Sequence, residues 1–305
     1  MPTDLIILGG GPAGLTAGMY AARARIPVIL VEKGIPGGQM AATEIVENYP
    51  GFVEPIYGAE LSAKMEAHAK KFGLEIVQAD IRSVERDGTG FRLSADSGSG
   101  YSCKALIVAT GASPVKPGIP GELELAGKGV SYCAVCDGPF FKDLEVAVIG
   151  GGDSAVQEAV YLTRFASRVH LIHRRDDLRA VKELQEKAFG EPKIVMHWSY
   201  VPVEIMGARE VEGIRLRSVK DGPEMTLPVG GVFFYVGLKP STEEIRHLVE
   251  TDPAGFILTD EKMASSTPGI FAAGDVRCKQ LRQISTAVGD GAAAAYSAQL
   301  YLESL

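Results

Sequence analysis

The sequence predicts an α/β fold with two Rossmann-like dinucleotide-binding domains, one inserted into the other. A glycine-rich fingerprint occurs twice, and each copy stands between a short apolar run and a helical stretch. The residues after the second strand of each copy are acidic in the first copy and basic in the second. A fingerprint in this setting binds the pyrophosphate of a dinucleotide at a helix N-terminus.

The first copy opens the chain. Its expected elements are a strand at Leu5–Leu8, a turn at Gly9–Gly14, a helix to about Arg25 and a strand at Val28–Val31. Gly9 is expected to allow the tight turn, Gly11 to let the backbone approach the pyrophosphate, and Gly14 to let the helix pack on the strand. We therefore assign these three glycines to cofactor binding.

The second copy begins well inside the chain. Its expected elements are a strand at Val146–Ile149, a turn at Gly150–Ala155, a helix to about Phe165 and a strand at Val169–Ile172. The copies are in register, because Gly9 to Glu32 spans 32 − 9 = 23 positions and Gly150 to His173 spans 173 − 150 = 23. Gly150 and Gly152 should take the roles of the first two glycines of the first copy.

The residue that follows each second strand selects the coenzyme. A carboxylate at Glu32 would accept hydrogen bonds from ribose hydroxyls and repel a 2′-phosphate. Arg174, Arg175 and Arg179 would bind a 2′-phosphate through charge-assisted bonds, which predicts NADPH at the second site. The alternative for these arginines is a solvated basic helix start.

A closely spaced cysteine pair stands just before the second fingerprint. Cys133 and Cys136 have the spacing of a redox-active dithiol, and Asp137 follows directly, where a carboxyl group can exchange a proton with a thiolate. The alternatives are two ordinary buried thiols or half of a metal site. We expect structural roles for Cys103 and Cys278.

Two stretches rich in proline and glycine, at 113–121 and 237–242, bracket the second copy. They divide the chain into a discontinuous domain of residues 1–115 and 245–305 and an inserted domain of residues 116–244. Short strands near Phe256–Leu258 and Ile270–Ala273 and a helix from about Gln283 to Leu302 should complete the first domain.

The composition excludes several classes of protein. Of 305 residues, 46% are hydrophobic and 23% charged, which is typical of a globular protein, and the net charge of 31 − 38 = −7 disfavours a nucleic-acid binder. No apolar run approaches the ~20 residues that a membrane span needs. The five histidines have no metal-ligand spacing, so no metal is expected. We expect a cytoplasmic protein.

Together, the motifs resemble one family closely, the low-molecular-weight bacterial thioredoxin reductases, over essentially the whole chain. The segments that carry the resemblance are Gly9–Gly14, Pro36–Gln39, Glu47–Gly51, Ala109–Gly111, Cys133–Asp137, Gly150–Ala155, His173–Asp176 with Arg179, Gly274–Asp275 and Arg282–Gln283.

The resemblance implies FAD in the discontinuous domain, NADPH in the inserted domain, a homodimer, and thioredoxin as the substrate. The implied FAD contacts are Gly11, Glu32, Gly38, Gln39, Asn48, Asp275, Arg282 and Gln283. The implied NADPH contacts are Gly152, Ser154, Arg174, Arg175 and Arg179. Cys136 would face the flavin, Cys133 would attack the protein substrate, and Asp137 would be the acid and base.

The expected reaction sends electrons from NADPH through the flavin to Cys133–Cys136 and then to thioredoxin. Because the nicotinamide and the dithiol would lie on one domain and both must reach the flavin, we expect that domain to rotate about the paired connections.

Two alternatives remain open, and a glutathione-reductase-like protein is disfavoured. The same chemistry could serve another disulfide carrier, either glutaredoxin-like or peroxidase-linked. A glutathione-reductase-like protein would carry its dithiol in the FAD domain and need a longer chain. A flavin-binding sensor without turnover would leave the dithiol and the arginines unexplained.

Overall fold

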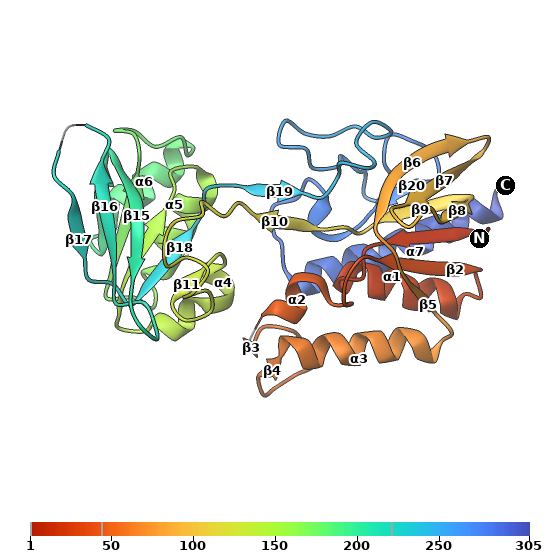
Figure 1. The fold of residues 1–305 in the computed structure, drawn as a ribbon, viewed down its shortest axis with the longest axis horizontal. Helices are drawn as coiled ribbons and strands as arrows, with labels where there is room; N and C mark the ends of the chain where they lie inside the picture. Colours follow the sequence, from red (N-terminus) through yellow and green to blue (C-terminus); the bar gives the residue numbers. More distant parts are fainter. Residues whose placement is uncertain (1, 44, 221) are drawn as a thin grey trace. The chain divides into compact units, whose positions relative to one another are not determined.

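The computed structural model describes residues 2–43, 45–220 and 222–305, and it divides into two compact units. Unit 1 combines the chain up to Ser113 with Lys239–Leu305, and unit 2 is Pro114–Leu238. The divisions lie two and six residues before the boundaries expected from composition. They fall within two short strands that pair with each other, β10 (Ala112–Pro114) and β19 (Leu238–Pro240) (Figure 1).

Unit 1 is built around a five-stranded parallel sheet of order β20-β9-β1-β2-β5. Its strands are β1 (Leu5–Leu8), β2 (Val28–Glu32), β5 (Glu75–Gln78), β9 (Ala105–Val108) and β20 (Ile270–Ala272). All four side chains of β1 are at most 5% exposed. A continuous apolar run of this kind is typical of a parallel strand that is covered on both faces.

The two faces of this sheet pack against different layers (Figure 1). Leu5 and Ile7 face a helical layer, whereas Ile6 and Leu8 face the opposite core, as the alternation of side chains along a strand requires. The helices of unit 1 are α1 (Pro12–Arg23), α2 (Gly38–Ala42), α3 (Gly58–Lys71), α7 (Ile284–Glu303) and the 3₁₀ turn η2 (Gly274–Val276). The antiparallel layer is β6 (Ile81–Asp87), β7 (Gly90–Ala95) and β8 (Gly100–Cys103), and a separate hairpin joins β3 (Ile45–Val46) to β4 (Ile56–Tyr57).

The last segment of the chain returns to unit 1. Strand β20 pairs with β9, and α7 packs closely on α1 through small residues. A side chain at Gly291 of α7 would collide with the carbonyl oxygen of Ala13 in α1. The strand expected at Phe256–Leu258 does not form. Only Ile257 makes isolated bridges there, one to Thr251 and one to Arg277, because each neighbouring segment offers it a single pairing residue.

Unit 2 repeats the plan with a parallel sheet of order β11-β18-β12-β13-β14. Its strands are β11 (Val130–Ser131), β12 (Glu145–Ile149), β13 (Arg168–His173), β14 (Ile194–Trp198) and β18 (Gly231–Phe234). One face packs on α4 (Ala134–Asp137), η1 (Gly138–Phe141), α5 (Asp153–Leu162) and α6 (Lys182–Gly190). The other packs on the antiparallel strands β15 (Tyr200–Met206), β16 (Gly213–Ser218) and β17 (Met225–Leu227).

The predicted fold class is therefore confirmed. Both units place helices, a parallel sheet and a three-stranded antiparallel sheet in successive layers. In each unit the glycine fingerprint joins a central strand to the helix that follows it, β1 to α1 in unit 1 and β12 to α5 in unit 2. This is the position where doubly wound folds bind a dinucleotide, at the carboxyl ends of the strands.

Candidate functional site

The first glycine turn has the backbone that a phosphate cradle requires. Gly9 has a φ of +100°, which only glycine adopts without strain, and a side chain at Gly14 would collide with the carbonyl oxygen of Gly9. By contrast, a Cβ atom at Gly11 would meet no heavy atom within 4 Å. The open side of the turn therefore lies at Gly11, beside the N-terminus of α1.

Glu32 lies directly beside this turn. Its Oε2 accepts a hydrogen bond of 2.6 Å from the Gly10 amide, and its Oε1 accepts one of 2.8 Å from the Gly34 amide. The end of β2 thus holds a carboxylate in the position from which it would bind ribose hydroxyls.

Segments distant in sequence gather around the same turn. A Cβ atom at Gly38 would lie 3.4 Å from the Cα atom of Gly11. The Gln39 amide donates a hydrogen bond to the carbonyl oxygen of Ala112. The Asn48 amide nitrogen donates a 3.1 Å hydrogen bond to Gln283 Oε1 across 235 positions of sequence. The fold therefore brings together two residues that were each expected to contact FAD.

Asp275 and Arg282 meet in η2 and the loop that follows it. Asp275 Oδ1 is buried with no hydrogen-bond partner among the described residues, and burial raises the pKa of this carboxyl. The Arg282 guanidinium stacks on Phe256, 4.1 Å from the ring centroid, and donates to the carbonyl oxygens of Asp275 (3.4 Å) and Arg277 (3.2 Å).

These features fit FAD. An open glycine turn, a carboxylate at the end of β2 and an orphaned buried carboxylate oxygen at Asp275 supply the three kinds of contact that a dinucleotide with a polyhydroxyl chain would use. Gly11, Glu32, Gly38, Gln39, Asn48, Asp275, Arg282 and Gln283 are the residues that would hold it.

The second glycine turn has the same open side. A Cβ atom at Gly152 would have only one neighbour within 4 Å, the guanidinium of Arg179 at 4.0 Å. The Arg179 amide donates a 2.7 Å hydrogen bond to the carbonyl oxygen of Gly151, which fixes the arginine beside the turn. A side chain at Gly150 would collide with Ala155. Ser154 is exposed in the first turn of α5.

The basic side chains after β13 converge on one position. Burial and then the charges of Arg179, Arg175 and Arg174 lower the pKa of His173. His173 Nε2 is buried with no partner among the described residues. All three arginine side chains are exposed, so they remain free to take an anionic ligand. This donor set fits the 2′-phosphate of NADPH.

The two predicted redox cysteines form a disulfide, with their Cα atoms 5.3 Å apart. Cys133 is the N-cap of α4, and its sulfur accepts a 3.2 Å hydrogen bond from the Cys136 amide. Both cysteines are half-buried, so the turn that carries them is partly open to solvent. We call residues 131–137 the dithiol turn.

Asp137 is the last residue of the dithiol turn and bonds back to its first residue. Its Oδ2 accepts a 2.6 Å hydrogen bond from the Ser131 hydroxyl, and the same hydroxyl oxygen accepts the Cys133 amide at 3.1 Å. Burial raises the pKa of Asp137, and the Ser131 hydrogen bond opposes that rise. A half-buried carboxyl of this kind can keep its proton at higher pH than an exposed one.

Ser131 and Tyr235 are site residues that the sequence did not reveal. The Tyr235 hydroxyl accepts the Ala134 amide at 2.6 Å, and burial and then the Glu158 charge raise its pKa. Tyr235 follows β18, about a hundred positions from the cysteines, and no motif marks it. A serine two positions before a cysteine was a weak signal that local hydrogen bonding could have explained.

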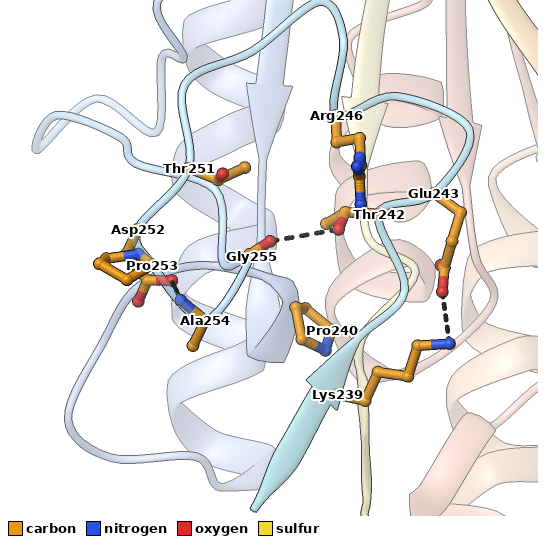
Figure 2. Close-up of a pocket in the computed structure, with 10 residues that line it drawn as sticks. All are labelled: Lys239, Pro240, Thr242, Glu243, Arg246, Thr251, Asp252, Pro253, Ala254 and Gly255. Atoms are coloured by element: carbon orange, nitrogen blue, oxygen red, sulfur yellow. Dashed lines mark hydrogen bonds and ion pairs between the residues drawn. The ribbon is translucent and has the colours of Figure 1, made fainter.

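A surface hollow of about 380 Å³ in unit 1 contains none of the predicted site residues. In Figure 2 the Lys239 ammonium points to Glu243, 2.7 Å away, and the Thr242 hydroxyl donates to the carbonyl oxygen of Gly255 at 3.1 Å. These groups bind each other, and we assign the hollow no function. Within the described chain, no helix is long and apolar enough to cross a membrane.

Comparison with known proteins shows the family of the chain. The family model of pyridine nucleotide-disulphide oxidoreductases matches residues 3–291. A thioredoxin reductase of Listeria monocytogenes is 52% identical over 303 residues, covering 99% of this chain and 94% of that protein. One of Bacillus subtilis is 50% identical over 303 residues, covering 99% and 95%. The crystal structure of thioredoxin reductase from Streptococcus pyogenes superposes with a TM-score of 0.93 at 47% identity, covering 100% and 99% of the two chains.

The family model spans residues 3–291, a range that contains both glycine turns and the cysteine pair. The chain belongs to the pyridine nucleotide-disulphide oxidoreductase family and, within it, to the thioredoxin reductases.

Proposed function

We propose that the protein binds FAD in unit 1 and NADPH in unit 2 and reduces the disulfide of thioredoxin through Cys133 and Cys136. The observation that carries the proposal is the dithiol turn, where a half-buried disulfide and a carboxyl of raised pKa lie in the same unit as the arginine cluster after β13. The relatives named above support thioredoxin as the substrate.

In unit 1, the open turn at Gly11 would receive the pyrophosphate and Glu32 the ribose of FAD. The orphaned Asp275 Oδ1 would accept a hydroxyl group. Bound FAD would supply the carrier of two electrons between the nicotinamide and the disulfide.

In unit 2, Gly152 and Ser154 at the start of α5 would receive the pyrophosphate of NADPH. Arg174, Arg175 and Arg179 would bind its 2′-phosphate, and NADH would lack this contact. The same reasoning assigns Gly9, Gly14 and Gly150 to the shape of the two turns rather than to direct contact.

At the dithiol turn, reduction breaks the S–S bond and leaves two electrons on the sulfurs. We assign Cys136 to the flavin side and Cys133 to attack on the thioredoxin disulfide. The Cys136 amide already points at Cys133 Sγ, so it would stabilise a thiolate there. Asp137 would give a proton to the departing sulfur and take one from the attacking thiol. We also propose a homodimer, as the family resemblance implies, which light scattering of the purified protein would test.

The test is NADPH-dependent reduction of oxidised thioredoxin by wild type and by Cys133→Ser and Cys136→Ser. Wild type should turn over, and each variant should lose thioredoxin reduction while NADPH still bleaches the flavin. With Cys136→Ser, a covalent complex with thioredoxin through Cys133 should be detected by mass spectrometry. Turnover with glutaredoxin or a peroxidase-linked carrier but not with thioredoxin would contradict the proposal.

A further inference from the structure

The dithiol turn is hydrogen-bonded to both of the connections that join the two units. One connection runs from β10 to residue 121, and the other runs from residue 235 to β19. They lie together at the backbone, because the Val115 amide donates a 2.9 Å hydrogen bond to the carbonyl oxygen of Gly237.

We call each hydrogen-bonded link between the dithiol turn and a connection a tie. The first tie passes through Glu122, which is fully buried. Glu122 Oε2 accepts the amides of Gly118 at 2.6 Å and Ile119 at 3.1 Å, and Oε1 accepts the Tyr132 hydroxyl at 2.6 Å. A carboxylate can be buried in a protein when hydrogen-bond donors satisfy both of its oxygens, as they do for Glu122. The first connection is thereby bonded to the side chain just before Cys133.

The second tie passes through Tyr235, at the end of β18. Its hydroxyl accepts the Ala134 amide at 2.6 Å, just after Cys133. Its neighbour Phe234 stacks on the Tyr132 ring with centroids 5.9 Å apart. Phe234 and Tyr235 therefore hold the dithiol turn from opposite faces of the sheet, and Tyr235 is the first residue of the second connection.

The two tied positions, 132 and 134, bracket Cys133. Reduction breaks the Cys133–Cys136 bond, adds two electrons to the sulfurs and lets them take up protons from solvent, so the sulfurs must separate to non-bonded distance. Cys133 then shifts between its two tied neighbours. A packed turn with satisfied hydrogen bonds transmits such a shift instead of absorbing it.

We propose that Tyr132 with Glu122, and Tyr235, are positioning residues that couple the redox state of the dithiol to the two connections. The disulfide keeps both ties intact, and reduction weakens them. The inference rests on the proposed function only for the source of electrons, since any reductant that opens the disulfide should have the same effect.

The experiment is hydrogen exchange by mass spectrometry on the full-length holoprotein, oxidised or reduced with a water-soluble phosphine, with neither NADPH nor thioredoxin added. The phosphine takes up oxygen from water as the disulfide becomes two thiols. Reduction should speed exchange in peptides covering 112–122 and 234–240 about fivefold, the factor for one typical net hydrogen bond.

Conservative variants separate the two ties. Tyr132→Phe keeps the ring on Phe234 and removes the bond to Glu122, so the response of 112–122 should disappear. Tyr235→Phe should remove the response of 234–240. The matched control is Tyr161→Phe, which shortens a tyrosine packed edge-on against Phe165 in the same unit and should keep both responses.

If reduction weakens the ties, the ties must in turn favour the disulfide, and this gives a second readout. Each Tyr→Phe variant should therefore be easier to reduce. A fivefold change in the equilibrium constant with dithiothreitol corresponds to a rise of about 20 mV in the reduction potential. The absence of a redox-dependent exchange change in wild type would overturn the inference, as would unchanged responses in both variants. Loss of thioredoxin reduction with the exchange response intact would instead overturn the proposed function alone.

Discussion

The Ser131 hydroxyl donates a 2.6 Å hydrogen bond to Asp137 Oδ2, within the same turn as the disulfide. Burial raises the pKa of Asp137, so its ionised form is disfavoured in the folded protein. The stability that this carboxyl contributes is present below its ordinary pKa and is lost as pH rises through the raised value.

Asp137→Asn should therefore separate activity from stability. The rate of thioredoxin reduction should fall about 100-fold, because the asparagine amide cannot exchange the proton. This factor is the lower end of the range for loss of a general acid and base. At neutral pH the melting temperature should not fall, because the variant no longer buries a charge. Stopped-flow turnover and thermal melting check the two parts. A wild-type rate would refute the acid–base assignment, and a marked loss of stability would contradict the unfavourable burial of this carboxylate.

The arginines after β13 should set the coenzyme preference. In Arg174→Ala/Arg175→Ala, kcat/KM for NADPH should fall about 100-fold, as expected when two charge-assisted contacts to a phosphate are lost, while that for NADH changes little. The matched control is Arg168→Ala at the start of β13, which pairs with Glu145 at 3.6 Å and should keep the preference. An unchanged NADPH/NADH ratio in the double variant would contradict the assignment.

Asp290 on α7 organises the loop that carries Asp275. It accepts hydrogen bonds or ion pairs from the Gly274 amide at 3.0 Å and from Arg277 and Lys279 at 2.8 Å each, and all three charged side chains are 11–14% exposed. Removing one partner of a buried ion pair leaves uncompensated charge and costs ~3–5 kcal/mol.

Asp290→Asn should therefore release FAD, with flavin affinity lowered at least about tenfold and unit 1 melting at lower temperature. The flavin-to-protein absorbance ratio after dialysis measures the loss. Glu66→Gln breaks an exposed pair with Lys70 on α3 and should change neither quantity. Full flavin retention by Asp290→Asn would show that the loop does not depend on this carboxylate.

Three polar side chains meet on neighbouring strands of unit 2. His170 Nε2 bonds to Glu145 at 2.8 Å, and His170 Nδ1 lies 2.9 Å from His197 Nε2. Burial and then the His170 charge lower the pKa of His197 to about 4. A lowered histidine pKa contributes stability that is present above the ordinary value near 6.5 and is lost as pH falls towards 4.

Unit 2 should thus lose stability between about pH 6.5 and pH 4, and His197→Gln should flatten this dependence. The single tryptophan, Trp198, is the next residue along β14, so its fluorescence reports unfolding at this place. Denaturant titrations at several pH values would measure the slope. Equal slopes in wild type and His197→Gln would show that another group governs it.

The sequence specified the repeated strand–turn–helix because it is local, and its glycines and charges lie at fixed spacing. Gly9, Glu32 and Arg179 could be found in this way. Residues that reach the site through tertiary packing could not. Tyr235 meets Ala134 only because β18 lies beside β11, and Asp290 meets Gly274 only because α7 returns to unit 1.

At Phe256–Leu258 the sequence predicted an element that the structure does not contain. The residues have strand propensity, but the partners beside Ile257 are single residues, so no ladder extends. The two compact units divide within β10 and β19, two and six residues before the bounds expected from composition. The predicted rotation of unit 2 stays a prediction.

We propose that electrons pass from NADPH through FAD to Cys133–Cys136. Anaerobic titration of the purified holoprotein with NADPH tests it most directly, followed at the flavin absorbance and by counting free thiols. The flavin of wild type should need two equivalents of NADPH, because the disulfide takes one pair of electrons, and that of Cys133→Ser should need one. Addition of oxidised thioredoxin should restore the flavin colour in wild type alone. Equal titration of both proteins, with no thiols gained at positions 133 and 136, would contradict the account.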